Sequence, residues 1–156
     1  MKRLLFPLIA ALALSTSVNA EVTNDYRLKS NQATKLFSEG KFSEMTKICD
    51  ELLEISPEFD FGYVCKGVSL GFNSENQKKR EAIRNFTKAI KINPEYNEPY
   101  FFRAVIKFSM RRREGLGFNR TACKDMEKAY LNKHPPALEY VKESKPFLKR
   151  NCVWPW

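Results

Sequence analysis

Residues Ala82–Pro94 read AIRNFTKAIKINP, an amphipathic segment that a proline closes. The same arrangement stands 37 residues earlier, where Glu51–Pro57 reads ELLEISP, and a third, degraded copy ends near Ala129. A period of this length is too long for one helix and is typical of helix-turn-helix repeats. Such repeats cannot bury their apolar faces alone, so they stack into a solenoid with a concave surface. The spacing therefore favours an all-helical scaffold that binds other molecules.

The hydrophobic pattern around these copies predicts helices along the chain and no strand-rich segment. The segments expected to be helical are Tyr26–Ser38, the stretch after Ser43 that Pro57 terminates, the stretch that Asp60 opens, Ala82–Ile92, Asn97–Ser109, Thr121–Leu131 and a last one that begins at Pro135 and Pro136. We expect Gly40 to end the first helix and Ser43 to cap the second. A polar turn is expected over Asn73–Arg80, and Pro146 is expected to stop or bend the last helix.

These segments resemble the tetratricopeptide repeat, a helix-turn-helix unit of about 34 residues. In that family the first helix carries a bulky aromatic, a small residue and an apolar residue, and the second carries a small residue, an aromatic, a small residue and a closing proline. The matching residues are Tyr63, Gly67 and Leu70, then Ala82, Phe86, Ala89 and Pro94, then Tyr100 and Ala104, with looser matches at Met45, Cys49, Leu52 and Pro57 and at Ala122, Met126 and Ala129. The resemblance implies three stacked repeats at about 26–59, 60–96 and 97–132, which form a short α-solenoid with a C-terminal capping helix at 135–152. The alternative is an unrelated helical bundle.

The first twenty residues have the composition of a leader for export. Lys2 and Arg3 form a positive start, and Leu4–Leu14 is an apolar run shorter than the roughly 20 residues that span a bilayer. The small residues before position 21 suit cleavage after Ala20, which leaves a domain at 21–156 without a transmembrane segment. The short leader without a twin-arginine pair favours the general bacterial export route, into the periplasm, a thylakoid lumen or the outside medium. The alternative is an N-terminal membrane anchor.

Four cysteines remain after the leader, an even number for an oxidising compartment. They are Cys49, Cys65, Cys123 and Cys152. Of the three possible pairings, the sequential one is the most natural, because each partner then lies on a neighbouring segment. Buried free thiols are the alternative. A metal site is disfavoured, because there is no Cys-x-x-Cys pair and His134 is the only histidine.

Stacked repeats of this family leave the inner faces of their helices open, and the register predicts an apolar, aromatic groove there. The predicted groove residues are Phe61, Val64, Val68, Phe72, Phe101, Phe102, Val105 and Phe108. One subset of tetratricopeptide proteins uses lysine, asparagine and arginine on this face to hold the terminal carboxylate of a partner. The residues at those places here are Ser30, Thr34, Cys65, Glu98 and Phe102, so this carboxylate clamp is absent. An apolar groove fits a peptide or helix of a protein partner. The alternative is an internal plug, formed by the last helix or by the tail Trp154-Pro155-Trp156.

The charge of the chain is unevenly distributed. Loss of the leader lowers the formal net charge from +9 to +7, and the first repeat is acidic while most of the positive excess follows Gln77. The basic residues expected in the second and third hairpin turns are Lys78, Lys79, Arg80, Arg111, Arg112, Arg113 and Arg120. Because successive hairpin turns of a solenoid emerge on one side, these residues are expected to form a basic rim. The rim predicts an alternative function, docking to an anionic membrane or envelope polymer. Plain solvated helix faces are the simpler interpretation, and export disfavours nucleic acid as a partner.

Signals for catalysis are weak. His134 lies between Lys133 and Pro135 with no obvious nucleophile, and the sequence has neither a phosphate-binding glycine loop nor a motif for zinc hydrolysis. We therefore expect no enzymatic activity and no cofactor. The leading hypothesis is a protein-protein interaction scaffold of the cell envelope. A purely structural role, by head-to-tail association of acidic and basic ends, is a further alternative.

Overall fold

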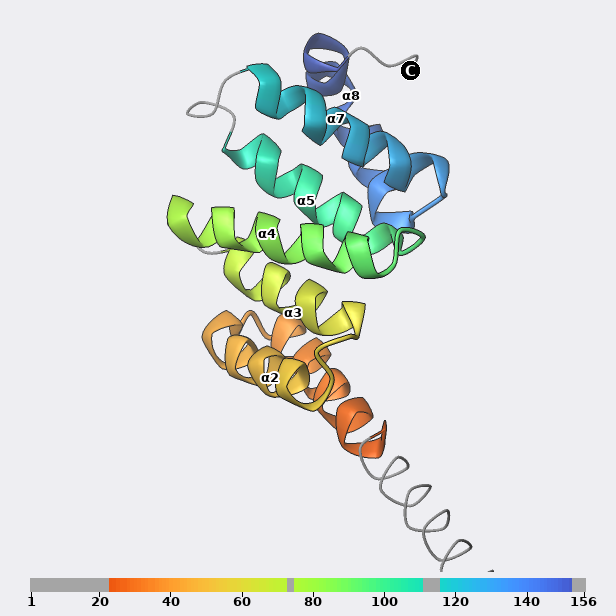
Figure 1. Ribbon diagram of the computed structural model, residues 1–156. Coiled ribbons are helices and arrows are strands. Elements are labelled where there is room, and N and C mark those ends of the chain that lie inside the picture. Colours follow the sequence, from red (N-terminus) through yellow and green to blue (C-terminus); the bar gives the residue numbers. More distant parts are fainter. Residues whose placement is uncertain (1–22, 73–74, 111–115, 153–156) are drawn as a thin grey trace, which may run out of the picture.

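The computed structural model describes residues 23–72, 75–110 and 116–152 of the 156-residue chain. In these ranges every regular element is a helix: one over residues 23–38, then α2 (Phe42–Ile55), α3 (Asp60–Gly71), α4 (Asn76–Ile92), α5 (Asn97–Ser109), α7 (Leu116–Leu131) and α8 (Pro135–Asn151). From α2 onward each helix packs against the next, and α3 also contacts α5. Figure 1 shows the helices stacked in sequence order, from the N-terminal helix at the bottom to α8 at the top. The fold is a short α-solenoid of three helical hairpins with a C-terminal capping helix, as the repeats predict.

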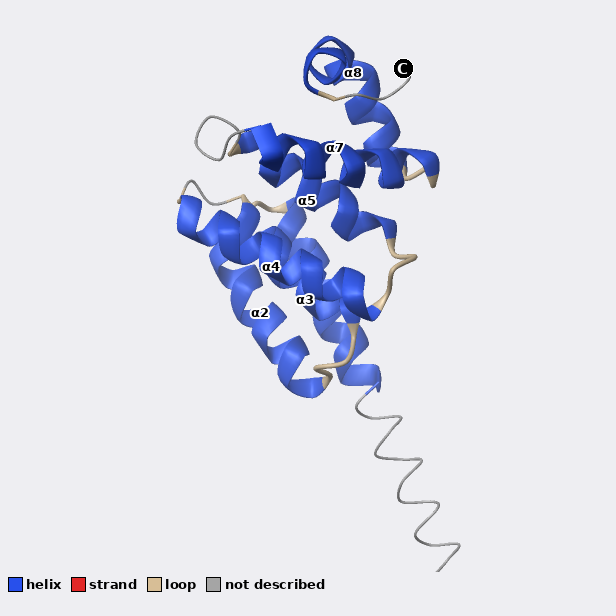
Figure 2. Cartoon of the chain, turned by 45° about the horizontal axis from the view of Figure 1, so that its top comes forward, coloured by secondary structure: helices blue, strands red, loops and turns tan. Residues whose placement is uncertain are grey.

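The predicted leader at 1–20 and the tail at 153–156 lie outside the described residues. Among the helices that are described, none is both long and apolar enough to cross a bilayer. Figure 2 shows the same stack turned toward the viewer, with short loops joining the helices.

A hydrogen bond between a tyrosine and a closing proline recurs with the period of the sequence repeat. The Tyr63 hydroxyl donates to the Pro57 carbonyl at 3.0 Å, and the Tyr100 hydroxyl donates to the Pro94 carbonyl at 3.2 Å. Each proline ends the preceding helix, because it has no N–H to continue the helical ladder. Its carbonyl then anchors the first helix of the next hairpin. The aromatic position of the repeat thus packs in the core and also fixes the loop before it.

The residues that carry the repeat pattern form the core between the hairpins. The residues of this set that are buried are Met45, Cys49, Leu52, Tyr63, Gly67, Leu70, Ala82, Phe86, Ala89, Ala104, Ala122, Met126 and Ala129. Gly67 shows why a small residue is needed, because a Cβ atom at this position would lie 2.6 Å from the Cε1 atom of Phe86. Real Cβ atoms do not approach a ring carbon so closely, so the missing side chain lets α3 and α4 pack at this distance.

The core is divided into two clusters that meet at α5. Ile106 and Met110 belong to the first cluster, with residues of the N-terminal helix, α2, α3 and α4. Ala104 and Phe108 belong to the second, with residues of α7 and α8. Each cluster contains one disulfide, so both sequential cysteine pairs are present in the structure. The pairs are Cys49–Cys65, which joins α2 to α3, and Cys123–Cys152, which joins α7 to the end of α8.

The predicted end of the first helix at Gly40 is confirmed. Gly40 has a φ of +70°, in the left-handed region that favours glycine. Its N–H donates to the Phe37 carbonyl at 3.0 Å, and the N–H of Lys41 donates to the Leu36 carbonyl at 2.9 Å. These two bonds form a Schellman motif, which satisfies carbonyls that the helix end leaves without partners.

Two other predictions about helix ends are wrong, and of the two outcomes predicted for Pro146 one, the stop, is excluded. Ser43 does not cap α2, because the chain leaves the Gly40 turn directly into a helix that begins at Phe42. The turn predicted over Asn73–Arg80 is shorter, because α4 begins inside it and its lysines and arginine are good helix formers. Pro146 does not stop α8, which continues to its end with the proline inside. Pro146 lies on an exposed part of the helix, where water can bond to the carbonyl that has lost its partner.

Candidate functional site

An open hollow of about 410 Å³ lies between the N-terminal helix, α2, α3 and α5. Its lining residues are Thr34, Phe37, Met45, Phe61, Val64, Cys65, Val68, Glu98 and Phe102. The N-terminal helix, α3 and α5 are the first helices of the three hairpins, and stacking brings these helices to one concave side. Four of the predicted groove residues, Phe61, Val64, Val68 and Phe102, therefore line one open hollow on the concave side of the solenoid.

Four phenylalanines gather at one end of the hollow, and we call them the phenylalanine cluster: Phe37, Phe42, Phe72 and Phe102. The rings of Phe42 and Phe72 stack with their centroids 5.4 Å apart. Phe102 touches two other members edge to face, with centroids 6.5 Å from Phe37 and 6.3 Å from Phe72. Phe37 is 38% exposed and Phe72 is 47% exposed, which is unusual for such large apolar side chains. The predicted groove residue Phe72 thus flanks the hollow and extends its apolar surface outward.

The other three predicted groove residues lie beneath α8. The ring of Phe101 is 5.4 Å from that of His134 and 6.1 Å from that of Tyr140. Phe108 stacks on Tyr140 at 6.4 Å, and Val105 packs in the same cluster. The predicted groove is therefore divided. The capping helix fills its C-terminal part, and the hollow between the N-terminal helix and α5 is the part that stays open.

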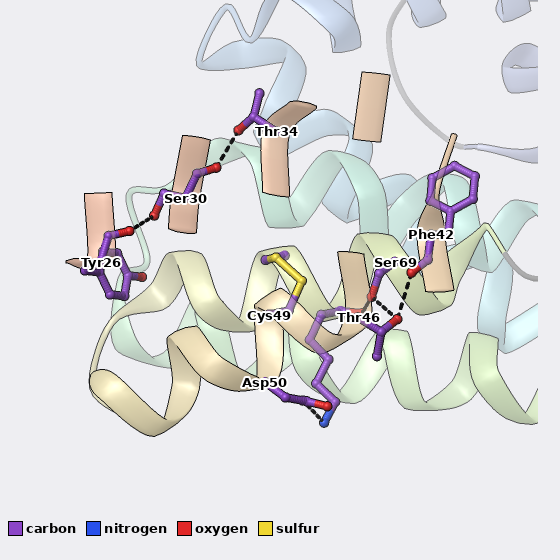
Figure 3. The surroundings of a disulfide bond; sticks show 10 residues. Tyr26, Ser30, Thr34, Phe42, Thr46, Cys49, Asp50 and Ser69 are labelled. Carbon is purple, nitrogen blue, oxygen red and sulfur yellow. Dashed lines mark hydrogen bonds and ion pairs between the residues drawn. A yellow bond between two sulfur atoms is a disulfide. The ribbon is translucent and has the colours of Figure 1, made fainter. Parts of the chain in front are cut away.

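The Cys49–Cys65 disulfide fixes the wall of the hollow, because Cys65 is one of the lining residues. Two side-chain bonds between α2 and α3 flank it: Thr46 to Ser69 at 3.0 Å and Lys66 to Asp50 at 2.6 Å. Figure 3 shows this arrangement, with Thr46 and Asp50 on either side of Cys49 along α2. A covalent bond and two polar contacts along one interface hold the wall in place before any ligand arrives. All four cysteines form disulfides, so none of them is free to bind a metal ion.

The opposite end of the hollow is acidic. Glu98 lies in the first turn of α5, where the helix dipole favours a negative charge, and its carboxylate accepts a 2.8 Å hydrogen bond from the Tyr96 hydroxyl. Asp60 also lies in a first turn, that of α3, and accepts a 2.7 Å bond from the side-chain amide of Asn93. Burial raises the pKa of Tyr26 to about 12, with a further contribution from Asp60. Burial and the Glu98 carboxylate also raise the pKa of Tyr96. A tyrosine is neutral at pH 7 with or without these shifts, so among the described residues the acidic side chains at this end of the hollow are Glu98 and Asp60 alone.

A buried ionic cluster joins α5 to α7, and the sequence analysis did not predict it. Arg103 contacts both oxygens of Asp125, from Nη2 at 2.6 Å and from Nε at 2.9 Å, and also donates to the Thr87 hydroxyl. Lys107 donates to the same carboxylate at 2.8 Å, and it and Asp125 are less than 10% exposed. Burial lowers the pKa of Lys107, and the negative charge of Asp125 acts in the opposite direction. The detectable signal was two cations four residues apart, Arg103 and Lys107, between buried residues of α5. The cluster lies within the core, so its role is to hold the helices together.

The predicted basic rim is only partly described. Lys78–Arg80 lie inside α4 and Arg120 lies inside α7, so the prediction that they belong to hairpin turns is wrong. The starts of both helices nevertheless lie on the same side of the solenoid (Figure 1). Lys78 is 3.3 Å from Glu75, while Arg80 and Arg120 are exposed. Arg111–Arg113 lie outside the described residues.

Comparison with known proteins shows the fold. No family model and no curated protein matches this sequence. The first TPR domain of Spaghetti (RPAP3), solved with the HSP90 peptide SRMEEVD, is 16% identical over 81% of this chain and 94% of that chain, with a TM-score of 0.63. The Sgt2 TPR domain of Aspergillus fumigatus is 14% identical over 84% of this chain and 85% of that chain, with a TM-score of 0.59. The TPR2B domain of yeast Sti1, solved in a complex with pHsp70, is 16% identical over 81% of this chain and 88% of that chain, with a TM-score of 0.57. This chain therefore has the fold of tetratricopeptide-repeat domains.

Proposed function

We propose that this chain is a non-enzymatic interaction scaffold that binds a peptide or helix of a partner protein in the open hollow. The observation that carries the proposal is an aromatic cavity left uncovered on the concave side of the solenoid, while α8 covers the rest of the same face. Large apolar side chains on a surface are usually covered by something. Two of the similar domains were solved with a peptide or partner, the HSP90 peptide and pHsp70, which supports the same use of the fold here.

The ligand of this chain differs in chemistry from the peptide bound to Spaghetti. That peptide, SRMEEVD, contains three acidic residues. The hollow here has no lysine or arginine among its lining residues, and its single charged side chain is Glu98. An acidic peptide would meet a like charge and no cation. We infer that the ligand is held mainly by apolar contacts.

We place this function in the cell envelope, on the basis of the leader predicted at 1–20. The two disulfides support this proposal, because such bonds persist in oxidising compartments and are rare in the cytosol.

The test is a selection of peptides from a random display library against the oxidised protein. Affinities of the selected peptides are then measured for Phe37→Ala and for Leu28→Ala, two exposed positions of the N-terminal helix of which only Phe37 lines the hollow. We expect Phe37→Ala to weaken binding about tenfold or more, as truncation of an aromatic anchor does, and Leu28→Ala to have little effect. Equal binding by both variants would show that the hollow is not the binding site.

The alternative, attachment through the basic rim, rests on the exposed Arg80 and Arg120. Attachment by surface charge weakens steeply with added salt, whereas binding in an apolar hollow changes little. Co-sedimentation with vesicles that contain 30% anionic lipid, at low and high salt, therefore distinguishes the two functions. Salt-sensitive sedimentation that Arg80→Ala and Arg120→Ala abolish would favour the rim.

A further inference from the structure

The hollow has one charged side chain among its lining residues, Glu98, and no cation of the described residues pairs with it. Within residues 23–72, 75–110 and 120–152, Glu98 makes no ion pair, and its hydrogen bond comes from the neutral Tyr96 hydroxyl. Lys29 and Lys66, on two helices that wall the hollow, pair with Glu51 and Asp50 at 2.6 Å. Within the described residues, the acidic end of the hollow therefore has no positive partner.

Asp60 and His134 also affect the charge at this end of the hollow. Asp60 interacts electrostatically with Tyr96, as Glu98 does, and brings a second negative charge to this end of the hollow. His134 lies close enough to Glu98 to interact with it, but burial lowers the pKa of His134 below 6.5. His134 is therefore largely neutral at pH 7 and does not supply the missing positive charge.

A bound ligand would change the surroundings of Glu98. A ligand that covers the hollow removes water from the carboxylate, and removal of water is unfavourable for a carboxylate that gains no new partner. A ligand with a cation at this end avoids that cost and is also attracted during approach. Charge complementarity therefore selects among the apolar ligands that the hollow can hold.

The geometry of α5 sets the spacing between the two features that the ligand meets. Glu98 and Phe102 are four residues apart, which is about 6 Å along a helix. Residues i and i+2 of an extended peptide lie on one face, about 7 Å apart. An extended ligand can thus place the side chain of its residue i beside Glu98 and the side chain of its residue i+2 beside Phe102 and Phe37.

We propose that the hollow recognises a segment with a cationic group, an arginine or lysine side chain or a free amino terminus, spaced two residues from an aromatic or long aliphatic side chain. The cation pairs with Glu98, and the apolar side chain packs against the phenylalanine cluster. This inference rests on the proposed function, because it specifies the ligand of the same site. It reverses the charge preference of a site built to hold a carboxylate.

The experiment uses the peptides selected from the random library. For the tightest peptide, the dissociation constant is measured with its basic residue intact and replaced by alanine, on the native protein and on Glu98→Gln. Glutamine keeps the size and the hydrogen bond with Tyr96 while it removes the charge. We expect the alanine replacement to weaken binding to the native protein about tenfold or more, and to weaken binding to Glu98→Gln about threefold or less. Far-UV circular dichroism and thermal melting establish that Glu98→Gln is folded.

The outcomes separate the two proposals. Peptides that depend on Phe37 but lack a basic residue, or whose basic residue matters equally for the native protein and Glu98→Gln, overturn this inference and leave the proposed function standing. Peptides that do not depend on Phe37 overturn the proposed function, and this inference with it. A basic residue that loses its effect only when Glu98 loses its charge supports both.

Discussion

The contact between Gly67 and Phe86 shows how a single residue sets the distance between two helices. A Cβ atom at Gly67 would lie within 2.9 Å of three ring carbons of Phe86, a side chain that is fully buried and cannot turn away. At Gly71, in the same helix, a Cβ atom would meet the terminal Cδ1 atom of Ile106 at 2.9 Å, and that flexible end can move. The two glycines therefore differ in what surrounds them, although both belong to α3.

We predict that Gly67→Ala destabilises the protein by about 1 to 3 kcal/mol, because overpacking a rigid core forces backbone shifts. Gly71→Ala serves as the matched control and should cost clearly less, because the isoleucine can change rotamer. Gly67 lies inside α3 and Gly71 is its last residue, so Gly67→Ala gains at least as much from the helix propensity of alanine, and a larger loss at Gly67 comes from the aromatic ring. The measurement is the free energy of unfolding in urea. Equal values for the two variants would contradict the prediction.

The second prediction at this scale concerns Asp125, which is the shared partner of Arg103 and Lys107. Asp125→Ala leaves the buried Lys107 and the largely buried Arg103 without a counter-charge, and we expect a loss of about 3 to 5 kcal/mol in unfolding free energy. Glu143→Ala, at an exposed position of α8, removes the same charge and should change stability by less than about 0.5 kcal/mol. Urea unfolding of both variants checks this. A loss below about 1 kcal/mol for Asp125→Ala would mean that water reaches the cluster and compensates the cations.

At the scale of the element, α8 carries a titratable group at its start. His134 is the N-cap residue of α8, and its Nδ1 atom is buried without a hydrogen-bond partner among the described residues. Burial lowers its pKa below 6.5, and Glu98 opposes the shift. The unfolded chain therefore takes up a proton at this histidine more readily than the folded one.

The sign of the pH dependence follows from this difference. The stability that comes from neutral His134 is fully present above pH 6.5 and is lost as the pH falls below that value. We expect the unfolding free energy of the native protein to be lower at pH 5.5 than at pH 7, and His134→Gln to lose less over the same range. Urea unfolding at the two pH values measures both. If His134→Gln shows the same loss as the native protein, another group is responsible.

The sequence predicts where the helices begin and end better than it predicts which of their residues another helix covers. The segment Asn97–Ser109 coincides with α5, because Pro99 marks its first turn and the hydrophobic period runs to its end. Phe101 and Phe102 are neighbours in that segment, and both were predicted to line the groove. They differ only because α8 crosses Phe101 and leaves Phe102 in the open hollow. The angle at which one helix crosses another is not encoded in the local sequence, so the sequence could not predict this difference. The bond from Arg103 to Asp125 was missed for the same reason, since its partners are 22 residues apart on different helices.

At the scale of the whole molecule, the stack has two cores and one element that belongs to both. Ile106 of α5 packs with α3 and α4, while Ala104 and Phe108 of the same helix pack with α7 and α8. The open hollow lies on the first core, and the covered part of the groove lies on the second. Because α5 contributes to both cores, a change at one end of the stack can reach the other through the packing of this helix.

Two fully buried leucines at opposite ends of the stack test how far such a change spreads. Leu52 lies on α2 in the first core and Leu148 lies on α8 in the second, and neither has exposed surface. Truncation of either leucine to alanine removes the same atoms and should cost about 2 to 5 kcal/mol. In a solenoid, stability is a sum of repeat terms and nearest-neighbour interface terms, so each loss should stay within its own core.

Native-state amide hydrogen exchange measures the spread helix by helix. We expect Leu148→Ala to speed exchange in α7 and α8 while α2 and α3 keep their protection, and Leu52→Ala to do the reverse. Protection of α5 should fall in both variants, because its residues belong to both cores. If each variant speeds exchange equally in every helix, the three hairpins unfold as a single unit. The hollow would then share its stability with the capping helix, and a variant of α8 would weaken peptide binding without touching the site.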